Sequence, residues 1–138
     1  MSEQNKVLAH RLLDALWNQA DFAVVDDIIT PDYDGHSSAV INGPDGAKSV
    51  ILEAHRAFPD FQMIFEDQIA EGDRVVTRWI CRGTHEGEFQ GMPPTGNQIA
   101  LNGITTFRIV DGQICDGWSS EDLLGLMRQI GAVPDMPR

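Results

Sequence analysis

Asp122 and His85 are the residues of this sequence whose side chains are best suited to acid–base chemistry. An aspartate acts as a general base near neutral pH when apolar surroundings raise its pKa. A fixed imidazole can stabilise the enolate oxygen that develops when a carbon between carbonyl groups loses a proton. If both side chains face one apolar pocket, the pair has the groups needed to remove such a proton and to stabilise the resulting enolate.

Both residues also have a purely structural interpretation. Ser119 and Asp122 have a spacing like that of a capping box at the start of the last predicted helix, where Asp122 would only stabilise the helix end. His85 shares strand parity with Trp79 and Cys81, so it could equally be a core histidine with satisfied hydrogen bonds. The local pattern alone leaves the two interpretations open for each residue.

A second group of residues offers contacts to a substrate or to a metal ion. Asp34 and His36 lie in a polar segment and, together with His85, could in principle ligate a metal. No His-x-x-x-His spacing supports this, so no metal site is predicted. Trp79 and Trp118 either stack on a planar conjugated substrate or belong to the core. The candidates for substrate contacts are His36, Trp79, Trp118, Tyr33, His55 and Met92.

The segment Gly-Met-Pro-Pro-Thr-Gly (91–96) follows the strand that ends near His85. Two prolines restrict the conformations of a loop, so a loop of this kind keeps its shape at low entropic cost. We interpret it as the rim of a pocket that His85 faces, although a simple connection between strands is the alternative.

The elements that must position these residues follow from hydrophobic periodicity. Apolar residues at helical spacing predict helices over 8–17, 22–29 and 44–58, the second with Asp21 as its N-cap and the first and third rich in leucine, alanine and valine. The segment 31–46 is expected to be a loop with a short extended piece around Tyr33. Pro31 and Pro59 are expected to end the helices that precede them.

The second half of the chain changes to strand periodicity. Alternating patterns predict strands over 61–69, 74–86, 97–110 and 113–120, with a tight turn at 71–73 and a two-residue hairpin turn at Asp111-Gly112. A last helix carries Leu123, Met127 and Ile130, and Gly131 is expected to cap its C-terminus. Three helices, a four-stranded antiparallel meander and a terminal helix predict a single α+β domain over 1–138. Its sheet must curl around the helices and leave a cone with an apolar interior.

Composition narrows the class of function. The formal net charge of −11 argues against nucleic acid and against anionic membranes as partners. The sequence has no apolar stretch long enough to span a bilayer, and its first residues lack the features of a secretory signal. The two cysteines, Cys81 and Cys115, are expected to be reduced, which fits a cytoplasmic location.

Three segments resemble one known family: GTHEGEFQGMPPTG (83–96), GITTFRIVDGQI (103–114) and WSSEDLLGL (118–126). They are similar to those of the SnoaL-like polyketide cyclases, which belong to the cone-shaped nuclear-transport-factor-2-like superfamily. The N-terminal helices and PDYDGHSS (31–38) extend the resemblance over nearly the whole chain. It implies ring closure by intramolecular aldol condensation without a metal or an organic cofactor. It also implies that the aspartate of the W-x-x-x-D motif, here Asp122, is the general acid/base, and that His85 and His36 bind oxygens of the substrate.

We therefore expect a cofactor-independent cyclase or isomerase of a small polyketide-like or other carbonyl compound. Two alternatives remain: a small-molecule-binding domain without catalysis, and an epoxide hydrolase of the limonene type. The second would need Asp122 with Arg78 or Arg82 and another carboxylate, and both arginines have the parity opposite to His85.

The family resemblance also implies a homodimer. The outer face of the predicted sheet carries Val76, Ile80, Ile104 and Val110, which would form a large apolar patch on a monomer.

Overall fold

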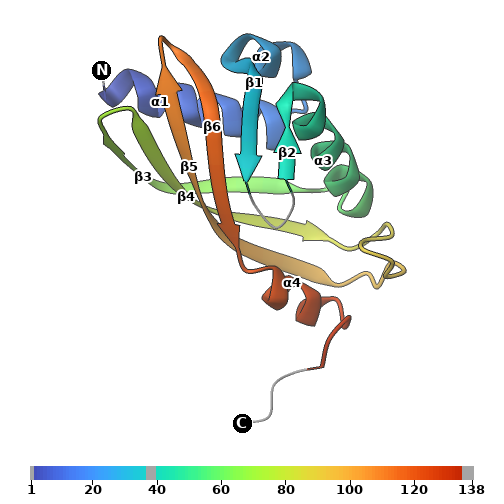
Figure 1. Cartoon of the computed structure of the whole chain (residues 1–138). Coiled ribbons are helices and arrows are strands. Elements are labelled where there is room, and N and C mark those ends of the chain that lie inside the picture. Colours follow the sequence, from blue (N-terminus) through green and yellow to red (C-terminus); the bar gives the residue numbers. More distant parts are fainter. Residues whose placement is uncertain (1, 37–39, 135–138) are drawn as a thin grey trace.

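The computed structural model describes residues 2–36 and 40–134, and for residues 40–44 it describes the backbone only. Helix α1 (Ser2–Leu13) continues into a π-helical turn, η1 (Asp14–Asn18), and is followed by α2 (Phe22–Ile28) and α3 (Gly43–Ala57). The strands are β1 (Ile29–His36), β2 (Val40–Asn42), β3 (Gln62–Glu71), β4 (Arg74–Thr84), β5 (Gln98–Val110) and β6 (Gln113–Glu121). Helix α4 (Leu123–Gln129) ends the described chain. The α+β class and the curved sheet around N-terminal helices are as predicted (Figure 1).

The strands form one sheet in the order β2-β1-β6-β5-β4-β3. The antiparallel meander from β3 to β6 confirms the prediction. Where a loop over 31–46 was predicted, the structure has the strands β1 and β2, and β1 runs parallel to β6. The extended piece expected around Tyr33 lies within β1, and α3 begins at Gly43, next to its predicted start at 44. Pro31, which read as a helix stop, is tolerated in β1 because the pairing with β6 is interrupted between Ile29 and Asp34. A proline lacks the N–H that a paired strand residue would have to donate.

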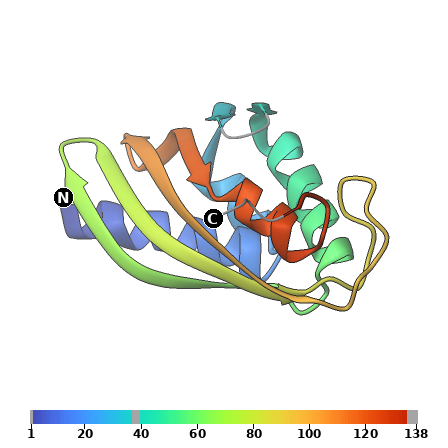
Figure 2. The ribbon, with the colours of Figure 1, turned by 90° about the horizontal axis from the view of Figure 1, so that it is seen from below.

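The sheet curves strongly along its long strands and wraps around the helices. Figure 2 shows this from below, with the strands bending under the helical layer. Strands β4 and β5 have 11 and 13 residues, and strands of this length twist as they extend. One register irregularity lies between Phe65 and Asp67, and another lies between Arg108 and Ile109. A bulge of this kind increases local bending and helps a sheet to close around a core.

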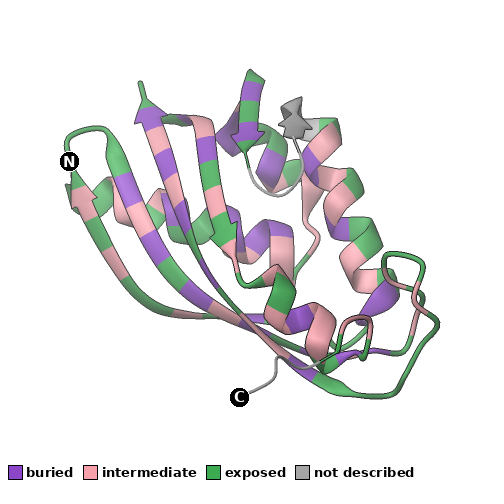
Figure 3. Cartoon of the chain, turned by 60° about the horizontal axis from the view of Figure 1, so that its bottom comes forward, coloured by how far each residue is buried: buried purple, intermediate pink, exposed green. Residues whose placement is uncertain are grey.

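Burial alternates along the strands, as Figure 3 shows by its bands of purple and green. On β4, Val75, Thr77, Trp79 and Cys81 are buried on the inner face. The inner residues join the helices in one core, which includes Leu12, Leu13, Val25, Ile28, Ile51, Phe107 and Ile114. The predicted strand parity is therefore confirmed, and with it the assignment of an inner and an outer face.

The predicted turns and caps are present. Asp111 and Gly112 have φ values of 53° and 76°, which a two-residue hairpin turn of type I′ requires. Asp21 caps α2 by accepting a hydrogen bond from the Val24 N–H at 3.3 Å. Gly131, with φ of 78°, ends α4 by donating its N–H to the carbonyl of Arg128 at 3.0 Å.

Helix α4 lies alongside β5, beyond the point where β6 ends. The Gln129 side chain accepts from the Ala100 N–H at 2.7 Å and donates to the Ala100 carbonyl at 2.9 Å. It thereby takes the place of a neighbouring strand. Leu126 of α4 and Ile130, its C-cap residue, pack with Ile99 in a second apolar cluster, which also contains Ala57 and Phe58. No helix within the described ranges is long and apolar enough to cross a lipid bilayer.

Candidate functional site

A cavity of about 50 Å³ lies between the helices and the inner face of the sheet. Its walls come from α1, η1, β1, α3, β5 and β6, and most of them are apolar: Leu12, Leu13, Leu16, Trp17, Ile29, Ala47, Val50 and Phe107. Three lining residues carry hydroxyl groups, namely Tyr33, Thr105 and Ser119. The cavity has room for a few water-sized groups, since one water needs at least about 10–15 Å³. It is smaller than a pocket for a drug-sized ligand, which occupies roughly 300 Å³ or more.

Two of these hydroxyls belong to a short chain of hydrogen bonds. Thr105 and Ser119 are direct partners on the antiparallel strands β5 and β6, and their hydroxyl oxygens are 2.9 Å apart. The Trp79 indole Nε1–H donates to the Thr105 hydroxyl oxygen, also at 2.9 Å. Trp79 can lie across β5 because Gly103, its partner on that strand, has no side chain, and a Cβ there would overlap the indole ring.

Tyr33 brings the third hydroxyl to the cavity from β1. Its ring is buried, and burial, followed by the nearby charge of Asp116, raises the pKa of its phenol to about 12. The hydroxyl therefore keeps its proton throughout the neutral range. Gly117 of β6 lies beneath this hydroxyl, and a side chain at that position would collide with it.

Asp122 lies outside this cavity. Its side chain is exposed and forms the N-cap of α4, accepting from the Gly125 N–H at 2.9 Å. Asp122 is thus the capping residue itself and does not occupy the third helical position that the capping-box interpretation gave it. It borders an open groove of about 430 Å³ on the outer face, together with Glu66, Arg78 and Ser120.

His85 is fully buried but does not line the cavity either. Its ring Nδ1 lies 3.0 Å from the Thr95 hydroxyl, and its ring centroid is 5.6 Å from that of Phe58. Its Nε2 is buried without a hydrogen-bond partner in the described part of the chain. Asp122 borders only the open groove and His85 lines neither the groove nor the cavity, so neither of these two spaces is the shared hollow that the sequence suggested.

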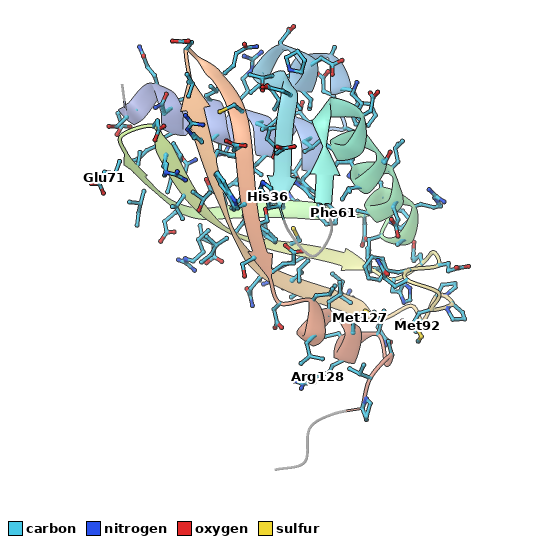
Figure 4. All side chains as sticks on the ribbon, viewed as in Figure 1. His36, Phe61, Glu71, Met92, Met127 and Arg128 are labelled. Carbon is cyan, nitrogen blue, oxygen red and sulfur yellow. The ribbon has the colours of Figure 1, made fainter. Side chains whose placement is uncertain are left out.

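The proline-containing loop packs against α3 and the second apolar cluster, away from the cavity. The N–H groups of Glu86 and Gly87 both donate to the Ala57 carbonyl at 3.0 Å. Met92 packs on the second cluster beside Met127 of α4, as the labelled side chains of Figure 4 show. The interpretation of this loop as the rim of a pocket facing His85 is corrected accordingly, since none of its residues lines the cavity.

Trp118 and His36 lie on the outer face of the sheet (Figure 4 labels His36). Their rings stack with centroids 5.5 Å apart, and the Arg74 guanidinium lies 5.3 Å from the Trp118 ring centroid. Trp79, by contrast, is buried on the inner face. The two tryptophans therefore cannot sandwich one ligand from the same side.

Asp34, His36 and Asp116 bring possible metal-ligand atoms to within 4.8 Å of one another on the outer face. Asp116 is also ion-paired with Arg108 at 3.4 Å. Of the metal set considered from the sequence, Asp34 and His36 lie together here, whereas His85 is buried elsewhere.

His55 connects two helical segments of the core. Its Nε2 lies 2.6 Å from the carbonyl oxygen of Trp17, which joins α3 to the turn after α1, and its ring lies 5.7 Å from that of Phe61.

The alternation of side chains along β5 and β6 also indicates inner-face polar residues that were not predicted as site residues. Thr105 and Ser119 share the inner face with Phe107, and Glu121 follows two residues after Ser119 on the same face. The charge of Glu121, after burial, contributes to a raised pKa of the buried Cys81 thiol. Glu121 is half-buried and borders the open groove together with Asp122, so the end of β6 brings two neighbouring carboxylates to that groove.

Comparison with known proteins agrees with this architecture. The family model of the SnoaL-like polyketide cyclases matches residues 7–130. The aklanonic acid methyl ester cyclase AcmA of Streptomyces galilaeus is 30% identical over 135 residues, which cover 95% of this chain and 92% of that protein.

Solved structures show the same fold. AclR of Streptomyces galilaeus, a proposed hydroxylase, superposes with a TM-score of 0.87 at 29% identity, over 100% of this chain and 87% of its own. A proposed SnoaL-like polyketide cyclase of Jannaschia sp. CCS1 also reaches a TM-score of 0.87, at 28% identity over 96% and 95% of the two chains.

Proposed function

Because the chain belongs to the SnoaL-like polyketide cyclase family, we propose that it closes a ring in a small carbonyl compound by an intramolecular aldol reaction. A base removes a proton from a carbon between two carbonyl groups, and the resulting carbanion attacks a second carbonyl carbon of the same molecule. The new alkoxide then takes up a proton. The reaction creates one carbon–carbon bond, leaves the mass unchanged and, as the family resemblance implies, needs no cofactor.

The observation that carries this proposal is the interior cavity with apolar walls and hydroxyl groups at its sheet side. Apolar walls exclude water from a carbanion, and hydroxyl donors stabilise the oxygen on which negative charge develops. The cavity is small, so a polyketide substrate can occupy it only with a slender end unless the helices move apart.

The base is proposed to be Asp122, as the W-x-x-x-D motif of the family implies. Its exposed position as a helix cap gives no apolar surround that would raise its pKa. Glu121, which is half-buried and close enough to Cys81 to help raise the pKa of its thiol, is therefore the carboxylate to compare with it. His85 is proposed as a donor to a substrate oxygen, as the family resemblance implies. It does not line the cavity, so its buried Nε2, which has no partner within the described residues, reaches a substrate only if the packing around Phe58 and Thr95 opens.

The experiment is a turnover assay with aklanonic acid methyl ester, the compound in the name of the curated relative, and with open-chain β-keto esters. We expect a product of unchanged mass with altered retention and absorption, which denatured protein does not form. A product that gains one oxygen atom would instead indicate a hydroxylase. Tight binding of a compound without any change over hours would favour the non-catalytic binding domain.

The same assay with a panel of epoxides tests the epoxide hydrolase. Glu66, Arg78 and Asp122 do border one groove, but the groove is open to solvent and Arg78 is ion-paired with Glu66 at 3.1 Å and with Asp67 at 3.2 Å. The enclosed, water-excluding site that such chemistry uses is missing from this groove. Diol formation from any epoxide would contradict this reasoning.

We further propose that the outer face joins two copies of the chain, as the family resemblance implies. Ile104 and Val110 are 45% and 40% exposed there, and Ile64 and Trp118 extend the apolar surface. Light scattering at micromolar concentration is expected to give the mass of a dimer. Ile104→Glu should yield a monomer, whereas the matched change Leu52→Glu on the exposed side of α3 should not. A monomeric wild-type protein would refute the proposal.

A further inference from the structure

The hydrogen bonds around Thr105 fix the number of donors that the cavity can offer. The Trp79 indole nitrogen can only donate, so it occupies an acceptor position on the Thr105 hydroxyl oxygen. One further hydrogen bond joins the Thr105 and Ser119 hydroxyls, and either of them can be its donor. The two hydroxyls have two O–H protons between them, and one of these protons is donated in this bond. Whichever direction the bond takes, one O–H proton of the pair remains for another acceptor.

The remaining proton has no acceptor among the described side-chain contacts of the pair, which are limited to these two bonds. Thr105 and Ser119 are among the residues that line the cavity, whereas Trp79 is not. Apart from Tyr33, the other lining residues are leucine, isoleucine, valine, alanine, tryptophan and phenylalanine, whose side chains offer no acceptor of comparable strength. A ligand that brings a hydrogen-bond acceptor into the cavity can therefore take this proton.

Tyr33 supplies a second donor to the same space. Its phenol stays protonated because burial and the charge of Asp116 raise its pKa to about 12. Gly117 leaves the room that this hydroxyl needs. Two O–H donors that converge on one small apolar space suit an oxygen with two lone pairs and no proton of its own.

We propose that the cavity is a binding site for the carbonyl oxygen of a ligand, with the Thr105–Ser119 hydroxyl pair and the Tyr33 hydroxyl as its donors. A cavity of about 50 Å³ is roughly a third of one that holds a benzene ring, about 150 Å³. It accepts an acetyl-sized group, so the ligand is a compound with a slender carbonyl end such as a methyl ketone. The catalytic role of these donors rests on the proposed function. Binding of a carbonyl group in the cavity can be tested whether or not the protein turns over a substrate.

The test uses acetone and isobutene, two molecules of nearly equal shape in which a carbonyl oxygen is replaced by a CH₂ group. Affinities are measured by titration in two-dimensional ¹H–¹⁵N NMR spectra, following the amides of β5 and β6 that border the cavity. We expect saturable shifts there with both probes and tighter binding of acetone.

The variants follow from the proton count. Ser119→Ala leaves the Thr105 proton, and Thr105→Val leaves the Ser119 proton, so each single change should alter the preference for acetone by less than about twofold. The double variant Thr105→Val/Ser119→Ala removes both donors. One hydrogen bond is worth about 1 kcal/mol, so the acetone-to-isobutene affinity ratio should fall about fivefold. Tyr33→Phe should lower the ratio by itself, because no neighbouring hydroxyl replaces its proton.

The matched control is Thr106→Val/Ser120→Ala, which makes the same chemical changes at adjacent positions that face the other side of the sheet. It should leave the ratio unchanged. Three results would overturn the proposal: acetone that binds no more tightly than isobutene, cavity amides that neither probe shifts, or a double variant that keeps the wild-type ratio. If the protein closes the ring but the double variant keeps the wild-type acetone-to-isobutene ratio, only the assignment of the donors is refuted. If the double variant changes this ratio but the protein turns over no substrate, only the proposed cyclase activity is refuted.

Discussion

Substitutions of Asp122 separate its role as a helix cap from a role as a base. Asparagine keeps an oxygen that can accept from the Gly125 N–H but carries no charge, and alanine removes the acceptor altogether. Loss of an N-cap acceptor costs about 1 kcal/mol, within a range of about 0.5–2. Loss of the negative charge at a helix N-terminus alone costs roughly 0.3–1 kcal/mol. The alanine variant should therefore be less stable than the asparagine variant.

These free energies convert into melting temperatures through the size of the chain. At about 2.1 cal/mol/K per residue, the 138 residues give an unfolding entropy of about 0.29 kcal/mol/K. One kcal/mol then corresponds to about 3–4 °C. Asp122→Ala should lower the midpoint of a calorimetric or circular-dichroism melt by about 3–4 °C, and Asp122→Asn by about 1–3 °C.

The turnover assay on the same two proteins identifies the base. If Asp122 abstracts the proton, the asparagine variant loses ring closure while nearly keeping its melting temperature. If it still closes the ring at the wild-type rate, Asp122 serves only as a cap, and Glu121→Gln becomes the variant that should lose activity. Equal destabilisation by asparagine and alanine would refute the capping argument, because the two differ in the acceptor oxygen.

Three further results are expected. Gly103→Ala should lower the unfolding free energy by about 1–3 kcal/mol in a urea melt, because the new Cβ would overlap the Trp79 ring in a closely packed core; a neutral change would contradict the packing described. The side-chain and backbone hydrogen bonds from Thr84 lower the pKa of Asp60, so they stabilise the fold above the ordinary aspartate pKa and lose this effect as the pH falls through the folded value. Thr84→Val should thus destabilise at pH 7 but not at strongly acidic pH, and an equal loss at both would argue against the linkage. Burial, then the charge of Glu121, raises the pKa of Cys81, so a thiol reagent at pH 8 should leave Cys81 unlabelled until the protein is unfolded.

The elements that sequence analysis predicted well are those with local determinants. Asp111-Gly112 specifies its hairpin turn, Asp21 caps its helix, and alternation along β4 assigns Trp79 and Cys81 to the interior. Strand β1 was predicted only as a short extended piece around Tyr33, and β2 was missed, because the cause of both strands is non-local. The segment 31–46 is rich in proline, glycine and aspartate, which indicate turns, and it becomes a strand only because the edge of β6 lies beside it.

The candidate site could be predicted only in part for a related reason. Parity placed His85 inside, and it is fully buried, but parity does not say which end of a long strand borders a cavity. His85 follows the last residue of β4, near α4, whereas the cavity borders Thr105 and Ser119 farther along the sheet. Asp122 follows the end of β6, where helix capping determines the direction of its side chain.

The polar character of the cavity depends on glycines as much as on hydroxyl residues. Gly103 and Gly117 occupy inner positions on neighbouring strands, and each is covered by an aromatic side chain, Trp79 in one case and Tyr33 in the other. The Trp79 ring lies over Gly103 and donates its indole N–H to Thr105, and the Tyr33 hydroxyl lies over Gly117. A larger residue at either glycine would lift the ring and move its polar atom, even though no donor is itself replaced. The glycines therefore position the hydrogen-bond donors, and selection for a carbonyl-binding interior would act on them as well as on the hydroxyl groups.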